Sequence, residues 1–269
     1  MEKVVVFVVN LEELKLKYFC NGLDVPYKLK DGNILNIKPI LVQDYPYFES
    51  ARQILIIPKN EINDIEIIKK SYLEFLLDLL KESESYIEYF LIICKLCFGF
   101  EKVACDNKSR KSIYLCDENQ VVKYIITHKE FDDIIKIILN QNDASYDNRY
   151  ISPDVRELMQ TYYNTVNKDV RTPDFEEKKA YVTSKTGISL DNINKMTYRY
   201  FDLVYTSSLN CEMYLTQKII QASEKYDVKG DIMHPLFQQK VDPYSEIFEE
   251  TSILQSKGFS GTNNLNLPN

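Results

Sequence analysis

The sequence predicts an α+β protein in which a mixed N-terminal region precedes an all-helical C-terminal region with an extended tail. Up to about residue 141, stretches with the two-residue period of strands alternate with stretches of helical three-and-four spacing, and only helical spacing follows. With 7 glycines in 269 residues, the chain does not resemble a many-turned β-sandwich. We therefore expect a mixed domain over residues 1–141, a joint over 142–151, a helical domain over 152–230 and a tail over 231–269.

The first predicted element is a β-hairpin between Pro26 and Pro39. Two short alternating segments flank Asp31-Gly32, a dipeptide that readily adopts the positive φ angles of a hairpin turn. Apolar spacing and capping residues then predict three helices, over residues 42–57, from Asp64 to about residue 79, and over residues 85–98. Strand-like segments separated by turn-forming residues predict a small antiparallel meander packed on these helices, over residues 100–106, 111–117 and 121–127.

Capping signals divide the rest of the chain into helices. Thr127 and Glu130 have the spacing of a capping box, which predicts a helix over residues 129–139. Two Ser/Thr-Pro pairs, at residues 152–153 and 172–173, each place an N-cap before proline at the first helical position. The second of these helices is expected to end at Gly187. Ser189 is expected to cap a short helix to about residue 195.

The longest predicted helix begins at Thr197 and spans roughly 40 Å at ~1.5 Å per residue. Its apolar stripe is narrow and contains small residues, which suits close packing against another helix. Packing against the protein's own core is the favoured interpretation, and packing against a partner is the alternative. The stripe consists of Phe201, Val204, Ser208, Cys211, Leu215, Ile219, Ala222 and Tyr226.

The polar stretch QNDASYDNRYISPDV, residues 141–155, is either a cation-binding loop or a joint. A calcium loop needs oxygen ligands at alternate positions, a glycine at the bend and a closing glutamate. Here Asp143 and Asp147 are four residues apart, there is no glycine, and Glu157 lies within the next predicted helix. Asn and Asp side chains commonly hydrogen-bond their own backbone turns instead. The stretch is therefore predicted to be a joint.

Charge and hydropathy exclude several classes of function. The net charge is −7 and the isoelectric point about 5.1, so a basic field that would bind nucleic acid is not expected. The longest apolar run, residues 89–100, is too short to span a membrane and contains Lys95. The N-terminal apolar run lacks the features of a signal peptide. We expect a cytosolic chain.

Six cysteines in such a chain are expected to be reduced thiols. Cys94, Cys97, Cys105 and Cys116 have a spacing that raises the possibility of a zinc site. The first pair lies in the apolar run FLIICKLCFGF, without the polar turns of a zinc knuckle, so these cysteines are predicted to be buried apolar residues. No metal or other cofactor is expected, and a zinc-stapled adaptor is the alternative.

No catalytic constellation stands out. The two histidines, His128 and His234, accompany no nucleophile motif, and the GFSG at residues 258–261 is not a nucleophile elbow. Phosphate-binding, dinucleotide-binding and zinc-protease motifs are absent from the sequence. Pairs of carboxylates are too numerous to single one out. The chain is predicted not to be an enzyme, and no small-molecule substrate is expected; an enzyme of unrecognised class is a further alternative.

The tail has the composition of a segment that becomes ordered on a partner. Its acidic and turn-forming residues separate apolar residues, and such segments commonly wrap a partner's surface with each apolar side chain in a shallow pocket. Folding back on the protein's own helical domain is the alternative. The candidate partner-binding residues are Leu236, Phe237, Tyr244, Ile247, Phe248, Leu254 and Phe259, with Ile253 beside them.

Three stretches of the sequence are PYKLKDGNILNIKPILVQDYPYF, IILNQNDASYDNRYISPDVREL and KKAYVTSKTGISLDNINKMTYRYFDLVY. All three resemble tail-morphogenesis proteins of long-tailed bacteriophages that infect low-GC Gram-positive hosts. The last contains Gly187-Ile188-Ser189, Ile193 and Met196-Thr197-Tyr198, which match a pattern of the helical region of tail and baseplate-hub assembly proteins. The resemblance covers most of residues 25–235 and includes no catalytic residue, and the tail lies outside it.

The resemblance implies a non-enzymatic tail or baseplate protein that acts by protein–protein contact. Its expected partners are other phage tail or baseplate subunits. Its expected location is the host cytoplasm during assembly. Two alternatives stay open: the protein remains in the virion, or it acts only as an assembly factor.

Overall fold

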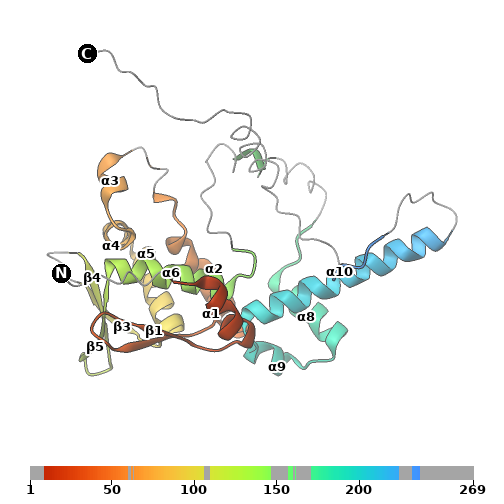
Figure 1. The fold of residues 1–269 in the computed structure, drawn as a ribbon, viewed down its shortest axis with the longest axis horizontal. Coiled ribbons are helices and arrows are strands. Elements are labelled where there is room, and N and C mark those ends of the chain that lie inside the picture. The colour runs from red at the N-terminus through yellow and green to blue at the C-terminus, as the bar shows by residue number, and fades with distance from the viewer. Residues whose placement is uncertain are drawn as a thin grey trace, which may run out of the picture. The chain divides into compact units, whose positions relative to one another are not determined.

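The computed structural model describes residues 9–59, 62, 64–105, 110–146, 157–159, 161, 171–223 and 232–236 (Figure 1). The chain divides into two compact units, residues 1–208 and 209–269. Strands lie in the N-terminal part and helices follow, which confirms the predicted α+β class. The limits predicted for the mixed and helical domains stay predictions. The joint and the tail lie largely outside the described residues.

The elements are as follows in chain order. The N-terminal part contains α1 (Leu11–Lys17), β1 (Val25–Lys28), β2 (Ile34–Ile37), α2 (Tyr45–Ala51), α3 (Ile65–Lys69), α4 (Tyr72–Glu82), α5 (Glu84–Ile93), β3 (Lys102–Cys105), β4 (Ser112–Cys116), β5 (Val122–Thr127) and α6 (His128–Asn142). Later elements are α8 (Phe175–Thr186), α9 (Leu190–Lys195) and α10 (Tyr198–Ala222), and residues 157–159 and 161 are also helical.

The predicted hairpin and meander are both confirmed. Strands β1 and β2 pair antiparallel with Val25 opposite Ile37, and Gly32 in the turn has a φ of +90°. Strands β3, β4 and β5 form an antiparallel sheet in that order. Side chains of both sheets enter the main core, which also receives apolar residues of α2, α4, α5 and α6. The sheets are therefore held by the surrounding helices and not by strand pairing alone.

Two of the predicted N-terminal helices are interrupted. The helix expected from Asp64 to about residue 79 consists of α3 and α4, because Ser71 and Glu74 form a capping box that starts a new helix. The segment expected as one helix over residues 42–57 contains α2 with one 3₁₀ turn before it and one 3₁₀ turn after it. The prediction of continuous helices was wrong at both places. Asp64 is a helix cap as expected.

The third predicted helix is α5 together with a π-helical turn over residues 94–98. The turn ends at Gly99, whose φ of +80° is readily adopted only by glycine. The backbone N–H of Lys38, just after β2, donates a hydrogen bond of 2.8 Å to the carbonyl of Cys97 in this turn. The π-helical turn thus connects α5 to the hairpin.

Helix α6 is the hydrogen-bonding centre of the mixed region. At its start, the buried carboxylate of Glu130 accepts bonds from the N–H of Thr127 at 2.8 Å and from the N–H of Lys30 at 2.7 Å. This is the predicted capping box, with the hairpin turn added to it. The helix extends to Asn142, three residues beyond the predicted end. One face carries buried apolar residues, including Phe131 and Ile134.

The later helices follow the predicted order with one correction. The N-cap of α8 is Asp174, which forms a capping box with Glu177, and not Thr172 as predicted. The helix ends at Gly187 in the left-handed conformation, and Ser189 caps α9, as expected. A small second core joins α8, α9 and the start of α10; its buried residues are Val42, Val182, Ile193 and Phe201.

Candidate functional site

The polar stretch of residues 141–155 begins with two buried side chains, those of Gln141 and Asn142. The side chain of Asn142 accepts a hydrogen bond of 2.7 Å from the N–H of Ile40 and donates one of 2.9 Å to the carbonyl of Ile138. Beside it, the buried Gln141 amide donates to the carbonyls of Leu23 and Ile37. These amides bind main-chain groups of the hairpin segment, so this part of the stretch is helical and structural.

The start of α10 binds the same chain segments. The Ile40 carbonyl accepts a bond of 2.7 Å from the N–H of Tyr198, and the N–H of Val42 donates to the carbonyl of Met196 at 2.9 Å. Arg199 donates from Nη1 to the carbonyl of Asn140 at 2.6 Å. We call residues 40–42, 140–142 and 196–199 the junction. It connects three chain segments that are far apart in the sequence.

Asp143 follows the junction and forms a local turn, and that the stretch is a joint stays a prediction. Its side chain accepts bonds from the N–H and hydroxyl of Ser145, at 2.8 and 2.6 Å, which is a local turn. Its other carboxylate oxygen lies 3.3 Å from Nη1 of Arg52. Asp147, the second acidic residue considered for a cation loop, lies outside the described residues, as do Ser152 and Pro153.

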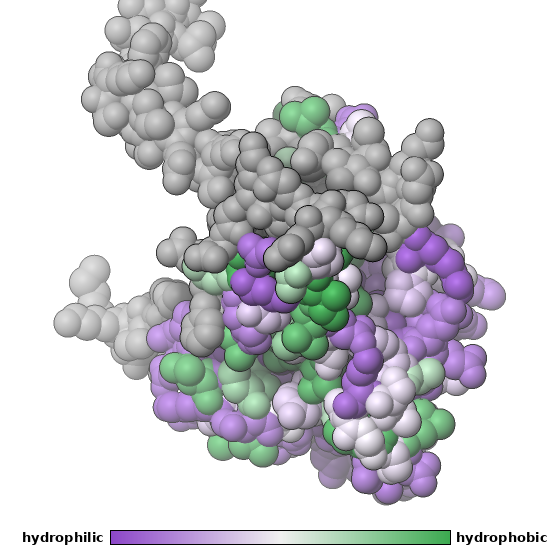
Figure 2. Space-filling model, turned by 90° about the vertical axis from the view of Figure 1, so that its right-hand side faces the viewer, coloured by the Kyte–Doolittle hydropathy of each residue, from purple (hydrophilic) through white to green (hydrophobic). Residues whose placement is uncertain are grey.

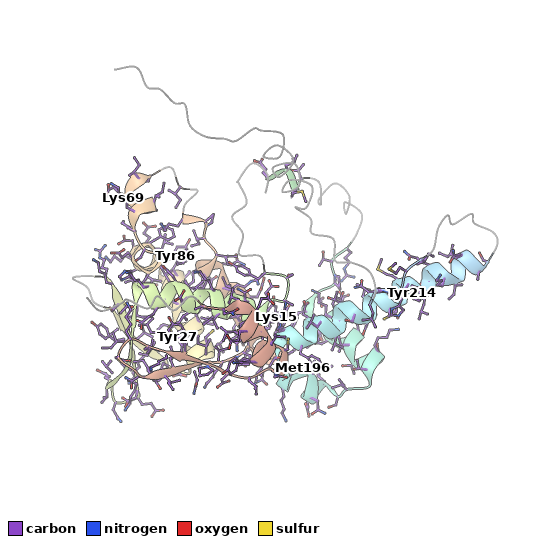
Figure 3. All side chains as sticks on the ribbon, viewed as in Figure 1. Lys15, Tyr27, Lys69, Tyr86, Met196 and Tyr214 are labelled. Atoms are coloured by element: carbon purple, nitrogen blue, oxygen red, sulfur yellow. The ribbon has the colours of Figure 1, made fainter. Side chains whose placement is uncertain are left out.

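The predicted partner-binding residues fall almost entirely beyond the described part of the chain. Leu236 is described, and its side chain is 78% exposed. The other six, Phe237, Tyr244, Ile247, Phe248, Leu254 and Phe259, lie outside the described residues. Just before Leu236, the ring of His234 packs edge-on against the ring of Tyr214, with 4.9 Å between centroids. Tyr214 is labelled on α10 in Figure 3.

The second half of α10 exposes apolar side chains. Phe201 and Val204, at its start, join the small core as expected from the apolar stripe. Leu215 and Ile219 on the same stripe are 57% and 71% exposed, so the expectation that this stripe faces the protein's own core is wrong for them. Other exposed apolar residues on this half are Leu209, Met213 and Ile220. Exposed apolar surface of this kind is typical of interaction sites.

A second candidate surface is an apolar pocket between α4, α5 and β3. Its volume is about 230 Å³. Cys105 on β3 is partly exposed, and burial raises the pKa of its thiol. The lining residues are Leu77, Leu80, Lys81, Ile87, Phe90, Leu91, Val103, Cys105 and Arg110.

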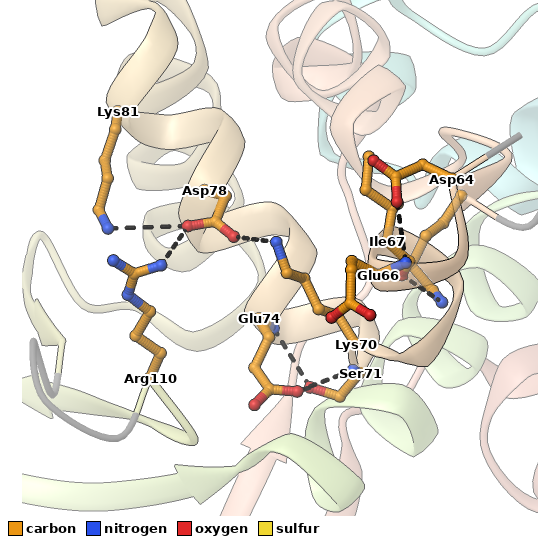
Figure 4. A network of polar contacts seen from close by, with 10 residues as sticks. Asp64, Glu66, Ile67, Lys70, Ser71, Glu74, Asp78, Lys81 and Arg110 are labelled. Carbon is orange, nitrogen blue, oxygen red and sulfur yellow. Dashed lines mark hydrogen bonds and ion pairs between the residues drawn. The ribbon is translucent and has the colours of Figure 1, made fainter. Parts of the chain in front are cut away.

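Positive charge gathers at the edge of this pocket around one carboxylate, Asp78 (Figure 4). Lys70 lies 2.8 Å and Lys81 3.7 Å from its oxygens, and Arg110 forms a shorter ion pair with it. The hydrogen bond from Lys70, with the charges of all three cations, lowers the pKa of Asp78. Three cations therefore share one anion, and two of them, Lys81 and Arg110, also line the pocket.

The sequence could have identified part of this cluster. Asp78 and Lys81 are neighbours on one helix face, and Lys70 precedes that helix. Arg110 could not be foreseen, because it follows β3 and reaches Asp78 only through the packing of the sheet on α4. The pocket itself depends on the same packing.

The four cysteines considered for zinc are distributed over three elements. Cys94 and Cys97 are buried in the π-helical turn, Cys105 lies on β3, and Cys116 is buried on β4. Burial raises the pKa of both Cys94 and Cys97, which opposes the thiolate form that zinc needs. Across the part of the chain that the structure describes, no group of three or more Cys, His, Asp or Glu could hold a metal ion. That the protein binds no metal stays a prediction.

The remaining sequence predictions concern catalysis and membranes. His128 is the first residue of α6, whereas His234 belongs to the second unit, near the end of the described chain. Of the helices described, none combines the length and hydrophobicity needed to cross a lipid bilayer. On the face drawn in Figure 2, apolar and hydrophilic patches alternate among the coloured residues.

The chain matches no model of a known protein family, no curated protein and no solved structure.

Proposed function

We propose that the chain is a non-enzymatic protein of a long-tailed bacteriophage that acts by protein–protein contact in tail or baseplate assembly. The observation that carries the proposal is the exposed apolar surface on the second half of α10, which includes Leu215 and Ile219. The resemblance in the sequence to tail-morphogenesis proteins supplies the class of partner. The proposed location is the host cytoplasm during assembly.

Burial of the α10 surface against another protein would be favourable. Removing apolar surface from water contributes roughly 25 cal/mol per Å². The apolar residues of the tail, beginning at the exposed Leu236, add further candidate contacts. The net charge of the whole chain is −7, which favours a protein partner over a nucleic acid. The proposed partners are other tail or baseplate subunits of the same phage.

The first test replaces Leu215 and Ile219 together with glutamine. We expect capture of tail or baseplate subunits from infected cells to fall about tenfold or more, because burial of a Leu or Ile side chain contributes roughly 1.5–3 kcal/mol and about 1.4 kcal/mol is tenfold in affinity. The readout is quantitative mass spectrometry of subunits bound to the tagged full-length chain. The thermal transition should change little, since both side chains are already exposed.

A matched control replaces Thr206 and Thr216, two exposed residues of α10, with glutamine. This variant should retain capture. If the unaltered chain captures no tail or baseplate subunit, the proposed function is wrong. If the chain does capture such subunits, mass spectrometry of purified virions distinguishes a resident subunit, which is present in the particle, from an assembly factor, which is not.

The tail is tested separately by deleting residues 241–269. If the tail docks on another subunit, the deletion should abolish capture and leave the thermal transition nearly unchanged. A markedly lower transition temperature would instead assign the tail to the protein's own core. The zinc-stapled adaptor is tested by metal analysis of the purified protein, where one zinc ion per chain would favour it over the proposed function.

A further inference from the structure

The pocket between α4, α5 and β3 has the chemistry of a site for an apolar side chain flanked by carboxylates. Its volume of about 230 Å³ is below the ~300–1,000 Å³ typical of small-molecule sites, so it suits a large side chain better than a cofactor. Apolar residues such as Leu77 and Phe90 form most of the lining. Lys81 and Arg110 add positive charge that Asp78 neutralises only in part.

We propose that this pocket binds residues 244–254 from a second copy of this chain, with Phe248 as the apolar residue that enters it. The inference rests on the proposed function in one respect, namely that the chain acts through protein contacts. It adds the identity of one partner, another copy, and the surface on which the tail docks.

The composition of the segment is complementary to the pocket. Glu246, Glu249 and Glu250 lie within two residues of Phe248 in the sequence, with carboxylates on both sides of it along the chain. Residues 241–256 contain no Lys or Arg. Carboxylates accept strong hydrogen bonds from Lys and Arg, and this complementarity selects an acidic segment over a neutral one.

The donor segment and the pocket are different surfaces of the chain, so a contact between two copies is head-to-tail. Such a head-to-tail contact lets each copy donate to one neighbour and accept from another, which generates rings or filaments. Copies that each carry a charge of −7 otherwise repel one another. Local pairing of the acidic segment with the cations around Asp78 offsets part of that repulsion.

Cys105 provides a direct readout, because it lines the pocket and is partly exposed. We expect its alkylation by N-ethylmaleimide in the full-length protein to slow as protein concentration rises, with the rate tracking the fraction of open pockets. When nine-tenths of the pockets are filled, the rate should be about tenfold lower. Alkylation of the exposed Cys20 should not depend on concentration, and peptide mapping separates the two sites.

Variants test the recognition on both sides of the contact. Phe248→Ser should remove the protection of Cys105, and Lys81→Glu should weaken it. Lys15→Glu is the matched control, because Lys15 is a similarly exposed helical lysine with a similarly long ion pair, 3.8 Å from Glu12. In the Lys81→Glu background, Glu249→Lys with Glu250→Lys should restore protection if opposite charges meet there.

Two results would overturn the inference. Alkylation of Cys105 that is independent of both concentration and Phe248→Ser would mean that the segment does not occupy the pocket. Protection that is lost in Phe248→Ser yet independent of concentration would mean that the segment comes from the same copy. Capture of tail or baseplate subunits is a separate measurement, so the proposed function can stand when this inference fails, and the reverse.

Discussion

Replacing Phe201 with alanine should lower the free energy of unfolding by about 3–5 kcal/mol. The side chain is 1% exposed and belongs to the second core, in which the other fully buried residues among those described come from the 3₁₀ turn before α2 and from α8 and α9. Its ring also packs edge-on against Phe175, with 5.8 Å between centroids. Seven partly buried apolar side chains of the described chain, among them Phe175 and Tyr198, pack against this core. They can fill the cavity only in part, so the loss should lie within this range.

Urea denaturation followed by circular dichroism measures this change. The matched control is Tyr200→Ala, because Tyr200 is the preceding residue of α10 and is 55% exposed. The control should change stability by no more than about 0.5 kcal/mol. A loss below about 1 kcal/mol for Phe201→Ala would contradict the described second core.

Replacing Asn142 with alanine should cost about 2–3 kcal/mol. The substitution leaves the buried N–H of Ile40 and the carbonyl of Ile138 without the side chain that now binds them. A buried N–H without a hydrogen-bond partner destabilises the folded state by the full free-energy cost of removing it from water. Because the carbonyl of Ile40 also binds the N–H of Tyr198, the whole junction should loosen.

Hydrogen exchange gives the local readout of this change. The amide of Ile40 should exchange faster in Asn142→Ala, beyond the effect of lower global stability. Asn140→Ala is the control, since its side chain bonds to the carbonyl of Lys136 within its own helix and its backbone carbonyl, which receives Arg199, is retained. Equal losses in the two variants would show that the Asn142 contacts have no special role.

Local signals in the sequence predicted most of the elements. Asp31-Gly32 located the hairpin, Thr127 and Glu130 located the start of α6, and Gly187 located the end of α8. Each signal acts within a few residues, so no tertiary information was needed. The errors arose where two local signals competed. Thr172-Pro173 and Asp174 with Glu177 are both helix starts, and the structure forms the capping box.

Features that depend on distant contacts were not predictable in this way. Periodic apolar spacing continues across Lys70 and Ser71, although the capping box divides the helix there. The polarity of the stretch that begins at Gln141 favoured a joint, whereas the amides of Gln141 and Asn142 are buried and bind main-chain groups of the hairpin segment. The pocket was missed for a related reason, since Arg110 meets Asp78 only in the folded chain.

The two ends of α6 also constrain the order in which the chain can fold during synthesis. Glu130 binds Lys30 and Asn142 binds Ile40, across sequence separations of 100 and 102 residues. At ~5–20 residues per second, the ribosome needs roughly 5–20 s to make the intervening chain. Through that interval the nascent hairpin lacks these polar contacts with α6, and a two-stranded hairpin alone is only marginally stable in water. The nascent chain is therefore exposed to chaperones and to misassociation until α6 leaves the exit tunnel.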